Sequence, residues 1–347
     1  MVEKRFIYDK KACIKLSDEQ KNYIRKVEEK ISTDEYKFEK KKCHICSSEE
    51  FSHLSEKDRY GLEMSVVICK NCGLVQTNPR MDELSYNKFY KNEYRSIYES
   101  GDDAIEKEFE KEINRGNEIF KYITENSKID LHGKFVVEIG TGAGGILKKF
   151  QDEGNRILGV DFGQEYIEFG IKNNLNLKVG SIEIIEQEEE KPDVVILSHV
   201  VEHFLEPIEM LTKIKKLLKR EGIVYVEVPG IKNLENSYQQ DLLKYLQNAH
   251  VFHFTLNTLE NCCKRAGLVL VKGNEVINSL FKSGEKENDF TSEYNDTLRY
   301  LEKIEKIRKN PMDSTKIKKG ILSRAVNILE KTKTKDTIKK IYRISKD

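Results

Sequence analysis

Between residue 131 and about residue 275, two patterns of hydrophobic and polar positions alternate along the chain. Four short apolar runs stand out, FVVEIG, RILGVDF, DVVILS and GIVYVEVP, and amphipathic stretches such as EPIEMLTKIKKLLKREG lie between them. Short apolar runs are typical of strands buried on both faces, and the spacing in the other stretches is that of helices. The pattern predicts an α/β domain with a Rossmann-like, mostly parallel central sheet flanked by helices. TLENCCKRAGLVLVKG adds one more helix and strand.

The composition of the chain changes several times outside these runs. We expect a charged helical leader at 1–42, a small metal-binding ribbon at 43–80 around the short strand MSVVIC, and a helical cap or linker at 81–130. The α/β domain then occupies 131–280, and a charged, basic helical tail occupies 281–347.

Charge is balanced over the whole chain, with 60 Lys and Arg against 59 Asp and Glu, so it gives no argument for a nucleic-acid partner. No run reaches the roughly eighteen apolar residues that span a bilayer, and the start of the chain lacks the apolar core of a secretory signal. We therefore expect a cytoplasmic protein with no transmembrane segment. Only 313–347 is strongly basic, with eleven Lys and Arg against four Asp and Glu. This tail can dock on an anionic membrane surface or a partner enzyme, or cover the protein's own core.

Four of the seven cysteines form two CxxC knuckles, Cys43 with Cys46 and Cys69 with Cys72. Two knuckles at this spacing bring four thiolates to one tetrahedral Zn2+ in zinc ribbons. We expect such a site to be closed and structural, because all four coordination positions are taken by protein. Four unconnected thiols, or a redox pair, are the alternative.

A glycine-rich turn follows the first apolar run. Gly140, Gly142 and Gly145 fit the pattern G-x-G-x-x-G, and Asp161 follows about twenty residues later, as in dinucleotide-binding folds. Several nucleotide-like ligands need the same turn. Glu138 favours a ligand that carries an ammonium and a sulfonium, because a carboxylate there repels paired phosphates.

Residues 131 to about 275 resemble the class I S-adenosyl-L-methionine-dependent methyltransferases. The motifs VVEIGTGAG, GVDF, SHVVEHFLEP and LLKREGIVYVEVP carry the resemblance by their order and spacing; a dehydrogenase-type domain is the alternative. The resemblance implies that the glycine turn holds the methionine portion of S-adenosyl-L-methionine and that Asp161 takes the ribose hydroxyls. The cofactor-binding residues that it implies are Glu138, Gly140, Thr141, Gly142, Gly144, Asp161, Phe162, Ser181, Ile182, Ser198 and His199.

The segment CKNCGLVQTNPRMDELSYNKFYKNEY extends the resemblance to residues 43 to about 275. It is similar to the zinc-binding domain of a bacterial subgroup that methylates nucleotide-linked sugars, polysaccharides and natural products. Sugar C-methyltransferases of that subgroup carry Tyr-His-Glu-His where this chain has Gln247, Asn248, Ala249 and His250. This departure favours methyl transfer to a heteroatom, most simply a hydroxyl, over C-methylation.

Three histidines are the candidate catalytic residues, His199, His203 and His250. His199 is the first choice for a general base because it follows a strand, although a satisfied structural histidine is as good an interpretation. Glu202 with His203 favours an orienting role. The set His199, Glu202 and His203 can also hold a divalent ion, as the resemblance to some hydroxyl methyltransferases implies.

The acceptor stays open at this point. A sugar, nucleotide sugar or glycan precursor is the main expectation. An RNA acceptor recognised by the zinc ribbon is the runner-up, although SHVV differs from the Asn/Asp-Pro-Pro-aromatic turn of adenine N6-methyltransferases. Sugar C-methylation and a non-catalytic scaffold that only binds the cofactor are the further alternatives.

Overall fold

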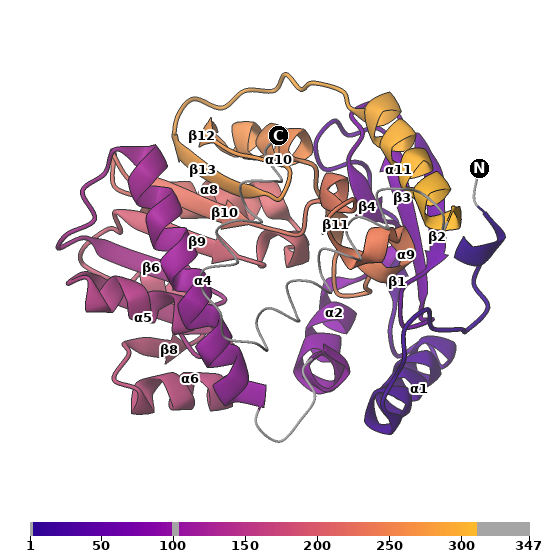
Figure 1. Ribbon diagram of the computed structural model, residues 1–347, viewed down its shortest axis with the longest axis horizontal. Coiled ribbons are helices and arrows are strands. Elements are labelled where there is room, and N and C mark those ends of the chain that lie inside the picture. The colour runs from indigo at the N-terminus through magenta and orange to yellow at the C-terminus, as the bar shows by residue number, and fades with distance from the viewer. Residues whose placement is uncertain (1–2, 99–103, 311–347) are drawn as a thin grey trace, which may run out of the picture.

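The computed structural model describes residues 3–98 and 104–310, and its largest element is a seven-stranded sheet of order β12-β13-β10-β9-β6-β7-β8 (Figure 1). The five strands β6 to β10 run parallel, whereas β13 is antiparallel to β10 and β12 is antiparallel to β13. The predicted Rossmann-like, mostly parallel sheet is confirmed. The strands are β6 Phe135–Ile139, β7 Arg156–Asp161, β8 Leu177–Val179, β9 Val194–Ser198, β10 Ile223–Glu227, β12 Leu268–Lys272 and β13 Asn278–Ser283.

Helices cover both faces of this sheet, which explains why the central strands read as unbroken apolar runs. Side chains of α4, α5 and α6 pack with one face, and those of α8 and α10 pack with the other. All five residues of β6 are buried. The helices are α4 Ala104–Ser127, α5 Gly145–Asp152, α6 Gln164–Lys172, α7 Ile182–Ile185, α8 Pro207–Leu217 and α10 Leu256–Ala266.

The long helix α4 packs along α5 at very short range. A Cβ on Gly116 would lie 2.6 Å from the main-chain oxygen of Ile146, and a Cβ on Gly145 would lie 2.6 Å from that of Phe109. Only glycine allows the two backbones to approach so closely. Residues 104–127 therefore belong to the layered domain by their packing, while the domain boundaries expected from the sequence stay predictions.

Residues 3–98, which we call the N-terminal unit, form a second body beside the sheet (Figure 1). Its four-stranded antiparallel sheet has the order β11-β4-β3-β2, and β1 pairs with β5 in a separate ribbon. The strand β11 Phe252–His253 belongs to the segment between β10 and α10, and it pairs with β4 of the N-terminal unit. The two bodies therefore share this sheet. The other elements are η1 Lys4–Phe6, α1 Asp18–Ser32, β1 Phe38–Glu39, β2 Phe51–Lys57, β3 Glu63–Cys69, β4 Val75–Thr77, β5 Arg80–Met81, α2 Glu83–Phe89, the π-helix η2 Tyr90–Tyr94 and α3 Arg95–Tyr98.

Short elements after β10 connect the two bodies, and the last described helix, α11 Tyr294–Lys309, packs against three of them. The basic tail predicted at 313–347 lies outside the described residues. Within the described ranges, no helix combines the length and the apolar character needed to cross a membrane. The short elements after β10 are η4 Ile231–Asn233, η5 Tyr238–Gln240 and α9 Leu242–Tyr245, and one more, η3 Val201–His203, follows β9.

Candidate active site

The predicted glycine turn lies between β6 and α5. The backbone is left-handed at Gly140 (φ 73°), Gly142 (φ 53°) and Gly144 (φ 80°), a conformation that costs glycine little. The backbone N–H groups of Gly140 and Thr141 donate to the main-chain oxygen of Val160 in β7, at 2.8 and 3.1 Å. The turn is therefore held against the neighbouring strand, and the N-terminus of α5 opens above the sheet edge.

Glu138 lies at the base of this turn and is 2% exposed. The Thr141 hydroxyl donates to its Oε2 at 2.8 Å. Burial raises the pKa of Glu138 well above its ordinary value, and the negative charges of Glu112 and Asp161 raise it further, while the Thr141 hydrogen bond and Arg115 act in the opposite direction. A cationic group placed beside Glu138 would stabilise its ionised form and lower this raised pKa.

Asp161 ends β7, the strand beside β6, so its carboxylate reaches the same sheet edge. Its Oδ2 accepts the backbone N–H of Gly142 at 3.1 Å, and its Oδ1 accepts that of Gly163 at 2.6 Å. The Arg95 guanidinium, from α3 of the N-terminal unit, lies 3.2 Å from Oδ1 and 3.8 Å from the centre of the Tyr166 ring. The structure thus links the glycine turn directly to the predicted ribose-binding carboxylate.

The other predicted cofactor residues spread around this edge. Phe162 is 79% exposed, which leaves its ring free to cover a flat base, while Ile182 is buried at the start of α7 and Ser181 precedes it. Ser198 ends β9, on the other side of β6, and its hydroxyl is buried with no hydrogen-bond partner in the described part of the chain. These positions surround the turn but stay predictions as cofactor contacts.

His199 follows β9 and is held in an unusual backbone conformation, with φ of 55°. Left-handed backbone at a residue other than glycine costs energy and is enriched at functional sites. Arg115 of α4 donates a hydrogen bond to His199 Nε2 and forms two bonds with Glu227, Nε to Oε2 at 3.1 Å and Nη2 to Oε1 at 2.7 Å. The side chain of His199 is 37% exposed, so of the three candidate histidines it is the most accessible.

Arg115 and Glu227 are functional candidates that sequence reasoning missed. Burial alone would raise the pKa of Glu227, but the hydrogen bonds and charge of Arg115 outweigh it and hold that pKa below its ordinary value. Glu227 is the last residue of β10, so the available signal was its place at a strand end, as for Glu138 and Asp161. Arg115 lies in a helix of no visible motif, and only the fold brings it to His199.

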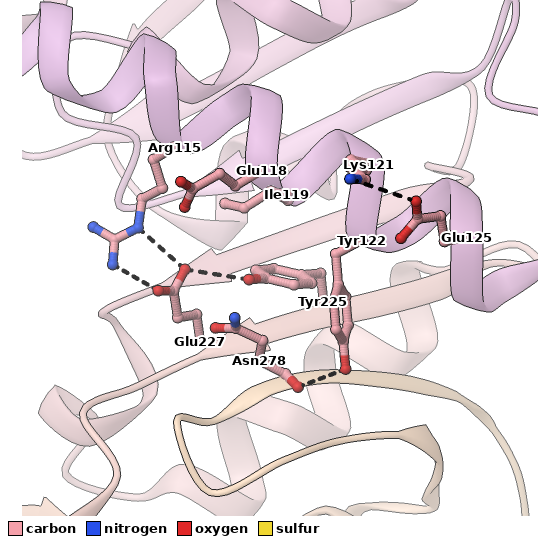
Figure 2. A pocket seen from close by; sticks show the side chains of 9 residues that line it. All are labelled: Arg115, Glu118, Ile119, Lys121, Tyr122, Glu125, Tyr225, Glu227 and Asn278. Atoms are coloured by element: carbon pink, nitrogen blue, oxygen red, sulfur yellow. Dashed lines mark hydrogen bonds and ion pairs between the residues drawn. The ribbon is translucent and has the colours of Figure 1, made fainter. Parts of the chain in front are cut away.

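A cavity of about 250 Å³ adjoins this ion pair, between α4 and the sheet (Figure 2). Figure 2 shows Arg115 and Glu227 at one end, Tyr122 and Tyr225 along the wall, and Asn278 at the start of β13. The Tyr122 hydroxyl donates to the main-chain oxygen of Asn278 at 2.8 Å. No predicted site residue lines this cavity, yet it is separated from His199 only by Arg115.

His203 and His250, the other catalytic candidates, meet around Glu202 in the interior. Each of the three offers a ligand atom within 4.8 Å of the other two. Glu202 Oε1 lies 3.9 Å from both imidazole Nε2 atoms, and neither oxygen of Glu202 accepts a hydrogen bond among the described residues. Burial lowers the pKa of His203 and lowers that of His250 well below its usual value. His199 Nδ1 also lies near this carboxylate, 3.4 Å from Glu202 Oε1. The set whose three ligand atoms all lie close to one another nevertheless has His250 in place of His199, unlike the set expected from the sequence.

The N-terminal unit holds the loop that carries His250. Asp58 is fully buried; its Oδ2 accepts the backbone N–H of Asn248 at 3.0 Å, and its Oδ1 accepts two N–H groups of its own turn. Burial raises the pKa of Asp58 to about 7, against the lowering effect of these three bonds. Arg59 donates to Gln247 Oε1, and the amide nitrogen of Gln247 donates to His250 Nε2.

The two cysteine knuckles converge as predicted. The Sγ atoms of Cys43, Cys46, Cys69 and Cys72 all lie within 4.8 Å of one another, with Cys43 to Cys72 at 3.3 Å and Cys46 to Cys69 at 3.5 Å. Four thiols at this range have the donor set of a tetrahedral zinc site. The other three cysteines lie apart from this cluster and are also free thiols.

The match to a known protein family falls largely within the α/β domain. Residues 111–272 match the family described as "Methyltransferase domain". The ubiquinone biosynthesis O-methyltransferase of Coxiella burnetii (strain Dugway 5J108-111) is 26% identical over 111 residues, 30% of this chain and 47% of that protein. The tRNA U34 carboxymethyltransferase of Campylobacter hominis is 25% identical over 146 residues, 40% of this chain and 51% of that protein. The chain thus spans about half the length of these curated relatives.

Solved structures include similar domains at low identity. The magnesium protoporphyrin IX methyltransferase of Synechocystis PCC 6803 is 13% identical, with a TM-score of 0.42, covering 59% of this chain and all of that one. The matched residues 111–272 begin within α4 and end with β12, so they contain the glycine turn, Asp161, His199 and Glu227. This region of the chain is a class I, S-adenosylmethionine-dependent methyltransferase domain.

Proposed function

We propose that the protein transfers a methyl group from S-adenosylmethionine to a hydroxyl, or an amine, of a sugar-like acceptor. The observation that carries the proposal is the set of groups at one sheet edge: buried Glu138, the left-handed glycine turn and Asp161, joined by the Gly142 to Asp161 hydrogen bond. The Glu138 carboxylate beside the turn suits a ligand with an ammonium and a sulfonium better than one with paired phosphates.

These residues fit the cofactor by their chemistry. Glu138 would face the cationic methionine portion, and Asp161 would accept the ribose hydroxyls. The cofactor supplies an electrophilic methyl on a sulfonium. This chain's own part is to exclude water, align the acceptor and hold its proton, and His199 is the best-placed group for that proton.

The acceptor is proposed from the zinc-domain resemblance and from the residues that replace the C-methylation set. A hydroxyl acceptor also agrees with the relatives named as ubiquinone biosynthesis O-methyltransferases, since that name denotes methyl transfer to oxygen. RNA is the second candidate, because other relatives are named as tRNA U34 enzymes, among them one from Sulfurimonas denitrificans, 24% identical over 193 residues.

We further propose that Cys43, Cys46, Cys69 and Cys72 hold a structural Zn2+. The support is the convergence of four Sγ atoms from two separate knuckles. His44, within the first knuckle, lies 3.3 Å from Glu206 in the loop after His203. The metal would therefore stabilise a part of the N-terminal unit that touches the candidate active site.

We also propose that Glu202 and His203, with His250, can bind a divalent ion. His203 Nδ1 lies 2.9 Å from the main-chain oxygen of Ala249. The Tyr90 hydroxyl contacts the same nitrogen. When Nδ1 donates to the carbonyl, Nε2 keeps its lone pair for a cation, as in metal-bound histidines. The Glu202 carboxylate accepts no hydrogen bond from the described residues, and its charge suits a cation.

The activity test uses the purified protein with S-adenosylmethionine and three acceptor pools: nucleotide sugars, glycans and total RNA. Mass spectrometry then searches each pool for the mass gain of one methyl replacing one hydrogen. Methylated sugar supports the main proposal and methylated RNA supports the second. Cofactor binding without a methylated product in any pool contradicts both and favours the scaffold.

A further inference from the structure

We propose that the cavity between α4 and the strands β10 and β13 binds the acceptor, and that it takes one neutral, non-planar, polyhydroxylated ring such as a single sugar residue. This inference rests on the proposed function. It moves the acceptor away from the cysteine-bearing N-terminal unit, onto a pocket built entirely by the methyltransferase domain and the strand that follows it (Figure 2).

The position of the cavity fits the reaction. Its inner end is the Arg115 to Glu227 ion pair, and Arg115 also donates to His199 Nε2. Glu227 Oε1 lies 3.8 Å from the same nitrogen. An acceptor hydroxyl that displaces Arg115 from His199 Nε2 reaches the lone pair that has to take its proton. Arg115 keeps its two bonds to Glu227 when this happens, so its charge stays compensated.

The chemical step then balances without another reactant. The acceptor oxygen forms a bond to the methyl carbon as the bond between that carbon and the sulfonium sulfur breaks. The hydroxyl proton moves to His199 Nε2, and the sulfonium becomes a neutral thioether.

The size of the cavity limits the occupant. About 250 Å³ is below the range of roughly 300–1,000 Å³ usual for drug-sized ligands. One six-membered ring with its hydroxyls suits such a volume, whereas a whole nucleotide sugar has to leave its nucleotide outside.

The charges along the wall favour a neutral occupant with many hydroxyls. Arg115 pairs with Glu227, and Lys121 lies 3.8 Å from Glu125, while the exposed Glu118 adds one more carboxylate. An anionic acceptor would meet more negative than positive groups. Hydroxyls both donate and accept, so they can bond to the carboxylates and the cations alike.

The aromatic wall argues against a flat ring. The Tyr122 and Tyr225 rings lie 6.0 Å apart between centres at an interplanar angle of 72°. Two rings at this angle form no parallel slot in which a uracil or a catechol could stack on both faces. Each ring offers a face or an edge to the C–H groups of a saturated ring instead.

An unused polar group lies beside the ion pair, because Asn278 is the residue of β13 that pairs with Glu227 of β10 (Figure 2). Asn278 Oδ1 is buried and has no hydrogen-bond partner in the described ranges. The residue before it, Ile277, is buried with φ of 60°, a conformation that is rare and costly for a β-branched side chain. A hydroxyl of the occupant would supply the hydrogen bond that this amide oxygen lacks.

The test is saturation-transfer NMR of the full chain with S-adenosylhomocysteine present. The probes are a mixture of methyl glucoside, methyl galactoside, methyl mannoside and methyl rhamnoside, with uridine and catechol measured separately. Two variants change the wall, Asn278→Leu on β13 beside Glu227 and Glu118→Ala on α4. Asn117→Leu, an exposed position of the same helix, is the matched control. Calorimetry with S-adenosylhomocysteine checks the fold and the cofactor site of every protein.

We expect at least one glycoside to respond in the wild type and in Asn117→Leu, and the response to fall about tenfold in both wall variants at unchanged cofactor affinity. If Asn278→Leu also loses S-adenosylhomocysteine binding, the glycoside response of Glu118→Ala alone tests the proposal. A wild type that binds cofactor but no glycoside, or equal glycoside binding in the wall variants, overturns the proposal, as does wall-dependent binding of uridine or catechol. A wild type that fails to bind S-adenosylhomocysteine overturns the proposed function itself.

Discussion

The two halves of the candidate active site are built in different ways. The cofactor half consists of the glycine turn and two strand-end carboxylates, Glu138 and Asp161, within about twenty-five residues of chain. The acceptor half joins Arg115 of α4, His199 after β9 and Glu227 at the end of β10, over more than a hundred residues. The first half depends on a local strand, turn and helix, whereas the second depends on how distant elements pack.

The difference extends to the N-terminal unit. It touches the cofactor half through Arg95, but it holds the histidine loops through Asp58, Arg59 and the tyrosine Tyr90, which bonds to His203. Damage to the N-terminal unit should therefore affect the histidine loops far more than the cofactor. The predictions below test this asymmetry, beginning with the largest effect.

Replacing Cys43 and Cys72 together by Ser should have the largest effect. We expect bound zinc to fall from about one ion per chain to none, since two of four ligands are lost. The N-terminal unit should lose several kcal/mol of stability, because structural zinc contributes on the order of 10 kcal/mol in small zinc domains. Elemental analysis and thermal unfolding measure both effects, with Cys13→Ser as the control cysteine outside the cluster.

The same double variant sharpens the comparison between the two halves. Its affinity for S-adenosylhomocysteine should stay within about threefold of the wild type, which is less than 1 kcal/mol. A zinc-free wild type would contradict the proposed metal site. Complete loss of cofactor binding in a folded variant would show that the two halves are not separable.

Asp161→Ala should abolish measurable cofactor binding while leaving the fold intact. Two hydroxyl hydrogen bonds to a carboxylate are each worth about 1.5–3 kcal/mol, so we expect a loss of about a hundredfold or more. Calorimetry measures the affinity, and Asp152→Ala on the surface of α5 is the control. Unchanged affinity in Asp161→Ala would refute the assignment of this carboxylate.

Glu138→Gln should weaken cofactor binding by about tenfold and remove a pH dependence. Burial raises the pKa of Glu138 well above its ordinary value in the free protein. A bound cation favours the ionised form, so binding at a pH near that raised pKa releases a proton. Affinity in the wild type should therefore increase as the pH rises toward that raised pKa and level off above it. Titrations in buffers of different ionisation enthalpy count the protons released. Equal proton release by the wild type and Glu138→Gln would exclude this role, and Glu153→Gln is the exposed control.

Arg95→Gln should have the smallest effect. Its ion pair with Asp161 is partly exposed, so its loss is worth about 0.2–1 kcal/mol. Because the guanidinium occupies a carboxylate that the ribose needs, we expect cofactor affinity to rise by up to about fivefold, with a weaker dependence on salt. Arg25→Gln on α1 is the control. A lower affinity in Arg95→Gln would instead make Arg95 part of the cofactor site.

The comparison also explains what the sequence could predict. The strands β6, β7, β9 and β10 lie where apolar runs predicted them, since strands buried on both faces need such runs. The cysteine cluster and the glycine turn followed from spacing alone. Arg115 was missed because nothing local distinguishes it from the other charged residues of α4. His250 was found through a family resemblance, but its place beside Glu202 depends on Asp58 and Arg59, which lie nearly two hundred residues earlier.

Isothermal titration of the wild-type protein with S-adenosylmethionine and with NAD+ tests the central claim most directly. Glu138 beside the glycine turn predicts heat of binding for the sulfonium compound, one site per chain, and none for the dinucleotide. Saturable binding of NAD+ with no response to S-adenosylmethionine would contradict the account.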